Sequence, residues 1–513
     1  MLVKTFGSAV HGINATTVTV EVNISKGTNF MIVGLPDNAV KESSYRISSA
    51  LTQVGYKWPG GYKVIINLAP ADIRKEGSAY DLTLATGILA ASEQLADVRL
   101  HEYIIMGELS LDGGLQPIKG ALPIAIQAQK EGFRGFILPI QNAREAAVVS
   151  GLEVYGAESI SQVVAFLQGK DVLGKVEVDI EQEFYNQVNR YDVDFADVKG
   201  QESVKRALEI AASGGHNLLM IGPPGAGKTM LAKRLPTIIP PLTLEEALET
   251  TKIHSVAGKI DKDASLITRR PFRSPHHTIS DVALVGGGSY PQPGEISLAH
   301  NGVLFLDELP EFKRTVLEVM RQPLEDRVIT ISRAKFAIEY PASFMLVASM
   351  NPCPCGYYNH PERACVCTPG LVQKYLNRIS GPLLDRIDIH IEVIPVPFEK
   401  ISESRLAEPS DQVRERVVKA RKVQLERFRN EKGIYCNAQI GSKLLRNYCR
   451  IDNAGQQLLK NAMEKLGLSA RAYDRILKVS RTIADLEKSE NILPNHLAEA
   501  IQYRSLDREG WAG

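Results

Sequence analysis

The sequence contains no apolar run long enough to cross a lipid bilayer, and residues 1–7 do not lead into the hydrophobic segment of a secretory signal. It has almost no net charge, with 60 lysines and arginines against 59 aspartates and glutamates. Contacts with a polyanion would therefore come from local basic patches rather than from the field of the whole surface. Six cysteines in 513 residues favour free thiols or metal ligands over a disulfide scaffold. We expect a cytoplasmic protein with no membrane partner.

The chain has the composition of an ordinary globular protein, with 44% hydrophobic and 23% charged residues, and its length indicates three or four domains. Residues 1–175 alternate strand-like and helix-like segments, and residues 176–192 are acidic and polar, as in a linker. Residues 193–398 carry the chemical motifs, and residues 399–513 show helical periodicity. We therefore predict an α/β core between a mixed α+β N-terminal domain and a helical C-terminal domain.

A glycine-rich loop follows the apolar run at residues 218–221 and precedes a helix-like segment at 230–235. The loop consists of Gly222, Pro223, Pro224, Gly225, Ala226, Gly227, Lys228 and Thr229. Strand, loop and helix in this order form the context of a P-loop, whose backbone N–H groups bind phosphates at a helix N-terminus. The pattern predicts ATP as ligand, with Lys228 on the β- and γ-phosphates and Thr229 on Mg²⁺.

Two carboxylates, Asp307 and Glu308, end a second apolar run at residues 303–306. Such a run fits a strand that is buried on both faces, and open α/β sheets bind ligands at the carboxyl ends of their strands. We expect Asp307 to hold Mg²⁺, directly or through water. We expect Glu308 to orient and deprotonate the attacking water as a general base.

A third predicted strand, residues 344–350, ends at Asn351. An amide at this place can hydrogen-bond the attacking water or the γ-phosphate. The alternative is a strand-end turn, because Asn-Pro is a turn signal.

Two long inserts interrupt the core. The first, around residues 269–278, is basic and rich in proline and histidine. It contains the adjacent His276 and His277, which have no further candidate metal ligands beside them in the sequence and so make a poor metal site. The second contains a predicted hairpin at residues 328–340 with Arg333 and Lys335 at its tip. The tip is either a solubilising turn or a contact for phosphates.

Two close cysteine pairs follow Asn351 directly: Cys353 with Cys355, and Cys365 with Cys367. Four thiolates can hold one tetrahedral Zn²⁺. Reduced, free thiols are the alternative, and His360 between the pairs is a candidate substitute ligand.

Part of the N-terminal domain resembles the Lon-protease/ribosomal-S5-type fold, on residues 74–81 and 107–120. That protease family uses a serine and a lysine. The aligned positions hold Ala79 and Leu122, neither of which can act as nucleophile or base. The resemblance therefore implies a non-proteolytic relative.

Residues 381–388, together with the preceding motifs, resemble the AAA+ ATPases of the magnesium-chelatase/MCM-like branch. This resemblance implies a P-loop core with a parallel sheet and a helical lid. It also implies a ring, most simply a hexamer, in which Arg386 enters the neighbouring site as an arginine finger. An ion pair to Asp385 or Asp388 is the alternative. Arg471 matches the sensor-2 arginine of the lid, or is an ordinary surface arginine.

The whole pattern resembles the YifB/ComM family of bacterial magnesium-chelatase-like ATPases. The resemblance rests on the Lon-like domain, the run at 272–277, the stretch at 351–356 and the helical tail. It implies a hexameric DNA helicase that drives branch migration while transforming DNA is integrated, with the hairpin tip on DNA phosphates in the ring pore.

Two other functions remain open. A magnesium-chelatase-like motor would act on a protein partner, and its ATP turnover would be indifferent to DNA. A Lon-like protease would require Ser78 and Lys119 to form a dyad.

Overall fold

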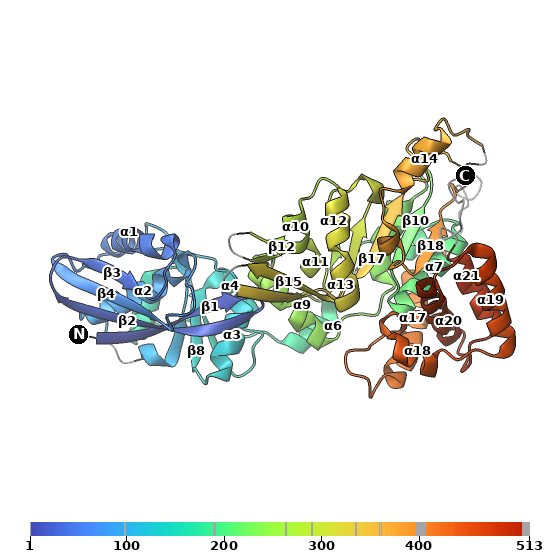
Figure 1. Cartoon of the computed structure of the whole chain (residues 1–513). Helices are drawn as coiled ribbons and strands as arrows, with labels where there is room; N and C mark the ends of the chain where they lie inside the picture. The colour runs from blue at the N-terminus through green and yellow to red at the C-terminus, as the bar shows by residue number, and fades with distance from the viewer. Residues whose placement is uncertain are drawn as a thin grey trace.

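The computed structural model describes residues 2–96, 99–187, 191–261, 264–288, 291–333, 336–358, 360, 362–396 and 407–504. The N-terminal domain, the core and the C-terminal helices follow one another along an elongated molecule (Figure 1). None of the helices in these ranges is both long and apolar enough to cross a membrane.

The N-terminal domain is built on a seven-stranded mixed sheet in the order β3-β4-β2-β1-β5-β8-β9. The strands are β1 (Leu2–His11), β2 (Asn14–Lys26), β3 (Phe30–Val33), β4 (Tyr62–Ala69), β5 (Tyr103–Ile105), β8 (Gly135–Pro139) and β9 (Glu153–Ala157). The helices are α1 (Asn38–Gln53), α2 (Asp81–Ala91), α3 (Ala121–Lys130), α4 (Ile140–Ala146) and α5 (Ile160–Leu167). All residues of α2 are buried, as expected for a helix that is apolar on every side.

Part of the segment predicted as a linker is helical. The helix α6 (Ile180–Gln187) buries Phe184 between the N-terminal domain and the core. The apolar cluster around it comprises Leu122, Val148, Phe184, Leu242, Ala247 and Leu266. A hydrogen bond from the Gly120 N–H to the Ser255 carbonyl, 3.1 Å long, joins the same two domains. The segment therefore helps to fix the N-terminal domain against the core.

The core contains the predicted parallel sheet, in the order β11-β14-β17-β10-β18. Its strands are β11 (Phe272–Arg273), β14 (Val303–Leu306), β17 (Met345–Met350), β10 (Leu218–Ile221) and β18 (Ile389–Glu392). Every residue of β10, β14 and β17 is buried, which explains their uninterrupted apolar sequences. Because the strands are parallel, their carboxyl ends meet at one edge of the sheet.

Helices pack around this sheet and carry the inserts. They are α7 (Glu202–Gly214), α8 (Lys228–Arg234), α9 (Leu244–Ala257), α10 (Asp281–Val285), α11 (Glu295–Leu298), α12 (Arg314–Val319), α13 (Arg321–Asp326), α14 (Pro369–Leu376) and α15 (Gly381–Leu384). The predicted hairpin is present as β15 (Val328–Arg333) and β16 (Phe336–Pro341), paired antiparallel up to Arg333 and Phe336. Lys335 and the side chain of Arg333 lie outside the described residues.

The hairpin extends toward the N-terminal domain (Figure 1). The turn between β1 and β2 reaches it, since a Cβ added at Gly12 would lie 2.9 Å from Ile338 Cγ2. Ile13 of the same turn packs on the apolar cluster that contains Ile329 and Tyr340. The N-terminal domain thus contacts the middle of the hairpin, where Ile338 pairs with Ile331.

The C-terminal region is helical, as the periodicity predicts. Its helices are α17 (Ser410–Arg427), α18 (Ser442–Tyr448), α19 (Asn453–Leu466), α20 (Ala470–Leu486) and α21 (Pro494–Gln502). Apolar residues of α17 and α20 share one buried cluster with α7 of the core, so the helical domain continues the core packing.

Candidate nucleotide site and cysteine cluster

The P-loop lies between β10 and α8, as its pattern predicts. Gly225 and Gly227 have φ angles of +80° and +87°, a region that favours glycine because it lacks a Cβ. These conformations turn the loop into the first turn of α8, where Lys228 is the first helical residue. The backbone geometry therefore explains why glycines stand at these positions.

Lys228 is buried and reaches back over its own loop. Its Nζ donates to the carbonyl of Gly222 at 2.6 Å, to that of Pro223 at 3.0 Å and to Asn351 Oδ1 at 3.1 Å. Burial lowers the pKa of Lys228, while the nearby Asp307 and Glu308 carboxylates oppose this shift. A bound polyphosphate would favour the ammonium form further. The sequence-predicted Asn351 is thus in direct contact with the P-loop lysine.

The two residues predicted to hold Mg²⁺ are adjacent. Thr229 Oγ1 donates to Asp307 Oδ2 at 2.7 Å. The other carboxylate oxygen, Oδ1, accepts a short hydrogen bond from Ser349 Oγ. Ser349 was not identified from the sequence, and its only signal is a polar residue within the buried strand β17. Thr229 and Asp307 provide the oxygen ligands that Mg²⁺ prefers.

Glu308 lies at the carboxyl end of β14 with a φ of +54°, and its side chain is 56% exposed. One carboxylate oxygen, Oε2, is 3.6 Å from His277 Nδ1. The His277 ring lies against the His276 ring, tilted by 34° with centroids 4.1 Å apart, and makes a T-shaped contact with Phe312. His277 lies beside Glu308 because β11 pairs with β14, so the loop that follows β11 runs next to the carboxyl end of β14, where the predicted general base Glu308 stands. Reasoning from the sequence considered the two histidines only as metal ligands and missed this contact.

Replacing His277 with alanine is expected to raise basal ATP hydrolysis by up to about fivefold. A neighbouring imidazole restrains the orientation of the carboxylate, and such half-exposed pairs contribute about 0.2–1 kcal/mol. Phosphate release without any polymer substrate measures the effect. His276→Ala is the matched control, because the His276 ring bonds Thr278 instead. Equal rates for both variants and the wild type would contradict the restraint.

Arg386 is only 6% exposed and is held within its own subunit. Its guanidinium pairs with Glu325 at 2.6 Å and donates to the Pro382 carbonyl at 2.5 Å. The intrasubunit partner is therefore neither of the two aspartates considered from the sequence. Asp388 pairs with Arg475 at 2.9 Å instead. The role of Arg386 in a neighbouring subunit remains a prediction.

Arg471 lies in the first turn of α20, which begins there because Ser469 Oγ accepts the N–H of Ala472 at 3.2 Å. The Arg471 side chain is 60% exposed and lies 3.4 Å from Asp385. Asp385 directly precedes Arg386, so the structure brings the two predicted arginines to the same segment. Its sensor role remains a prediction.

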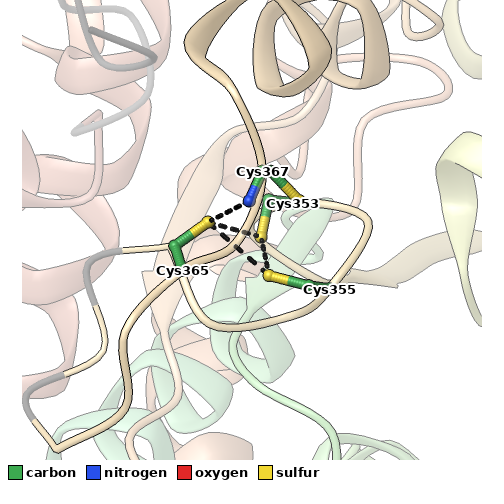
Figure 2. A group of neighbouring side chains, drawn as sticks. All are labelled: Cys353, Cys355, Cys365 and Cys367. Carbon is green, nitrogen blue, oxygen red and sulfur yellow. Dashed lines mark hydrogen bonds between the residues drawn. The ribbon is translucent and has the colours of Figure 1, made fainter.

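The four predicted cysteines form one cluster (Figure 2). Cys353 Sγ lies 3.3 Å from that of Cys355 and 3.7 Å from that of Cys365, and the last two are 3.5 Å apart. All four sulfurs, including that of Cys367, lie within 4.8 Å of one another, and none forms a disulfide. His360 is not in this group; its Nδ1 accepts N–H groups of its own loop.

The residues considered for a protease dyad have separate partners. Ser78 Oγ bonds the Glu108 carboxylate. The Lys119 side chain lies along Gly258 of the core, where an added Cβ would be 3.1 Å from Lys119 Cε. Neither contact prepares a serine nucleophile with a lysine base.

Family models of magnesium chelatase match three parts of the chain. "Magnesium chelatase, subunit ChlI" matches residues 194–401, "Subunit ChlI of Mg-chelatase" matches residues 20–142, and "Magnesium chelatase, subunit ChlI C-terminal" matches residues 407–504. Together they cover parts of all three domains.

Two relatives align over nearly the full length. "Competence protein ComM" of Haemophilus influenzae is 46% identical over 505 residues, covering 98% of this chain and 97% of that protein. "Uncharacterized protein YifB" of Escherichia coli is 47% identical over 508 residues, covering 98% and 96%. "Lon protease 2" of Bacillus subtilis is 32% identical over 159 residues, which cover 28% of this chain and 27% of that protein.

Proposed function

Because the chain belongs to the YifB/ComM family of magnesium-chelatase-like AAA+ ATPases, we propose that it is an ATP-driven DNA motor of the cytoplasm. Its subunits form a ring, most simply a hexamer, and ATP hydrolysis between subunits moves DNA through the centre. The reaction it serves is branch migration of recombination intermediates, such as those formed when transforming DNA is integrated. The name of the Haemophilus relative, a competence protein, supports this assignment.

The observation that carries the ATPase part of the proposal is the convergence of the motifs at one edge of the core sheet. The P-loop N–H groups and Lys228 bind the phosphates, and Thr229 and Asp307 hold Mg²⁺. Bound Mg²⁺ supplies charge neutralisation at the phosphate oxygens. Glu308 orients the attacking water and accepts its proton. Asn351, which contacts Lys228, hydrogen-bonds the attacking water or the γ-phosphate.

The DNA part rests on the hairpin β15–β16. In a ring of this family its tip, with Arg333 and Lys335, faces the pore, where cations contact the phosphates of a passing strand. Such contacts carry little sequence information and weaken as salt increases. The contact of the N-terminal domain with the middle of the hairpin, at Ile338, supports the strands that carry the tip.

Removing both tip cations, by Arg333→Ala with Lys335→Ala, is expected to weaken DNA binding at all sequences. The slope of log K against log salt should fall by about one for each phosphate that the tip no longer neutralises. Binding of branched DNA over a salt series, and ATP turnover with and without that DNA, measure the effect. The matched control removes two exposed cations from the helical domain, Arg429→Ala with Lys432→Ala.

The outcomes separate the two candidate functions. Turnover that rises with branched DNA in the wild type and the control, but not in the tip variant, supports the DNA motor. Wild-type turnover that is indifferent to DNA contradicts it and favours a motor that acts on a protein partner.

The proposal includes one structural Zn²⁺ at the cysteine cluster. A tetrahedron of four sulfurs with Zn–S bonds of about 2.3 Å has edges of about 3.8 Å. The sulfur distances among Cys353, Cys355 and Cys365 run from 3.3 to 3.7 Å, and the sulfur of Cys367 is within 4.8 Å of the others. The donor set therefore fits zinc in both chemistry and spacing.

A further inference from the structure

The cysteine cluster lies directly on the nucleotide site. Cys353 follows Asn351, the predicted partner of the attacking water or the γ-phosphate, by two residues. Gly356, in the turn after Cys355, has a φ of +84° and touches the P-loop so closely that an added Cβ would overlap Pro224 Cδ. The turn that carries the first cysteine pair therefore rests on the phosphate-binding loop.

The second cysteine pair leads into α14, which also reaches Asn351. Val372 of this helix is buried against Cys353. Tyr375, one turn further along, is buried with its hydroxyl near the backbone of Asn351. Asn351 in turn accepts the Lys228 ammonium at 3.1 Å. The cluster thus contacts the P-loop at Pro224 on one side and, through Asn351, Lys228 on the other.

Little else in the described part of this segment can order it. Its apolar cluster contains only two buried side chains, Cys353 and Val372, and the other three cysteines are half-buried. So small a satellite cluster offsets little of the entropy lost by ordering the loop between the cysteine pairs, at about 1–2 kcal/mol per residue. A tetrahedral metal ion bound by the four cysteines would supply enough binding free energy to order this loop.

We infer that zinc at Cys353, Cys355, Cys365 and Cys367 clamps the nucleotide site, so that ATP binding and hydrolysis depend on the metal. This inference rests on the zinc site proposed above. When the metal is lost, the turn at Gly356 and the start of α14 are released, and Pro224 and Asn351 lose their support. Removal of groups that orient a site typically costs 10- to 100-fold in affinity or rate. We expect a loss of that size in ATP affinity and turnover.

The test compares the full-length wild type with Cys365→Ser and Val366→Ser. Val366 is 85% exposed and lies between two of the cysteines, so its variant makes the same kind of change without removing a ligand. Metal content is measured by mass spectrometry, binding by a fluorescent ATP analogue, and turnover by phosphate release. We expect one zinc per chain in the wild type and Val366→Ser. Cys365→Ser should lose zinc and bind the analogue at least 10-fold more weakly.

A second arm avoids dependence on the folding of a variant. Wild type stripped with a zinc-selective chelator should lose analogue binding and regain it when one equivalent of zinc is returned, and Cys367→His should keep both zinc and binding. Stoichiometric zinc whose removal leaves analogue binding unchanged overturns the clamp. Protein that contains no zinc and binds the analogue fully overturns the metal site as well. Zinc-dependent analogue binding in a protein that DNA does not stimulate supports the clamp while contradicting the proposed DNA motor.

Discussion

A Glu308→Gln variant is expected to bind ATP as tightly as the wild type but to hydrolyse it about 10²- to 10⁴-fold more slowly, the usual contribution of a general base. Glutamine keeps the size of the side chain and its hydrogen-bonding reach, but it cannot take the proton of the attacking water. The carboxylate is half exposed at the end of β14, with His277 as its neighbour, and the backbone N–H of Glu308 donates to Asp307 Oδ1 at 3.1 Å.

Phosphate release at saturating ATP and equilibrium binding of an ATP analogue separate the two effects. Glu311→Gln is the matched control, because this carboxylate lies three residues further on and pairs with Arg378 at 2.9 Å. A Glu308→Gln variant with turnover within tenfold of the wild type would place the base elsewhere. Weaker analogue binding would show that Glu308 also supports the nucleotide itself.

Asp307, Glu308 and Asn351 could be predicted as site residues from the sequence because they follow short apolar runs. A strand buried on both faces is mostly apolar, so the polar Asp307 and Asn351 mark the ends of β14 and β17. The parallel sheet then brings these ends together. The cysteine cluster could also be predicted from the sequence, because two closely spaced cysteine pairs in one short segment must lie near one another in space.

The contacts that the predicted site residues make with other side chains could not be predicted from the sequence, because they depend on which strands and helices become neighbours. His277 reaches Glu308 only because β11 pairs with β14. Glu325 of α13 pairs with Arg386, which lies about 60 residues further along the chain, and no local sequence pattern predicts this pair. The same holds for α6, whose polar sequence suggested a linker although Phe184 is buried between two domains. Local sequence determines periodicity, whereas these pairs are fixed by tertiary packing.

Arg386→Ala is expected to lower ATP turnover by about 10³- to 10⁵-fold, the range of arginine fingers. In the single subunit the guanidinium is buried against Glu325 and Pro382, and its Nε has no hydrogen-bond partner among the described residues. A planar guanidinium can exchange a carboxylate for the oxygens of a γ-phosphate without changing its geometry. Glu325 would thus pair with Arg386 until the γ-phosphate of a nucleotide in the neighbouring subunit takes the place of the Glu325 carboxylate.

Two measurements separate a finger from a structural ion pair. Glu325→Gln removes the intrasubunit ion pair but leaves the arginine, so it should hydrolyse ATP at close to the wild-type rate. Mixing equal amounts of Arg386→Ala and Lys228→Ala subunits should restore activity that neither has alone. About one quarter of the interfaces in a randomly mixed ring then combine an intact Lys228 with an intact Arg386 from the neighbour. If mixing restores nothing and Glu325→Gln is as inactive as Arg386→Ala, the arginine acts within its own subunit, and the interface between subunits is not where ATP is cleaved.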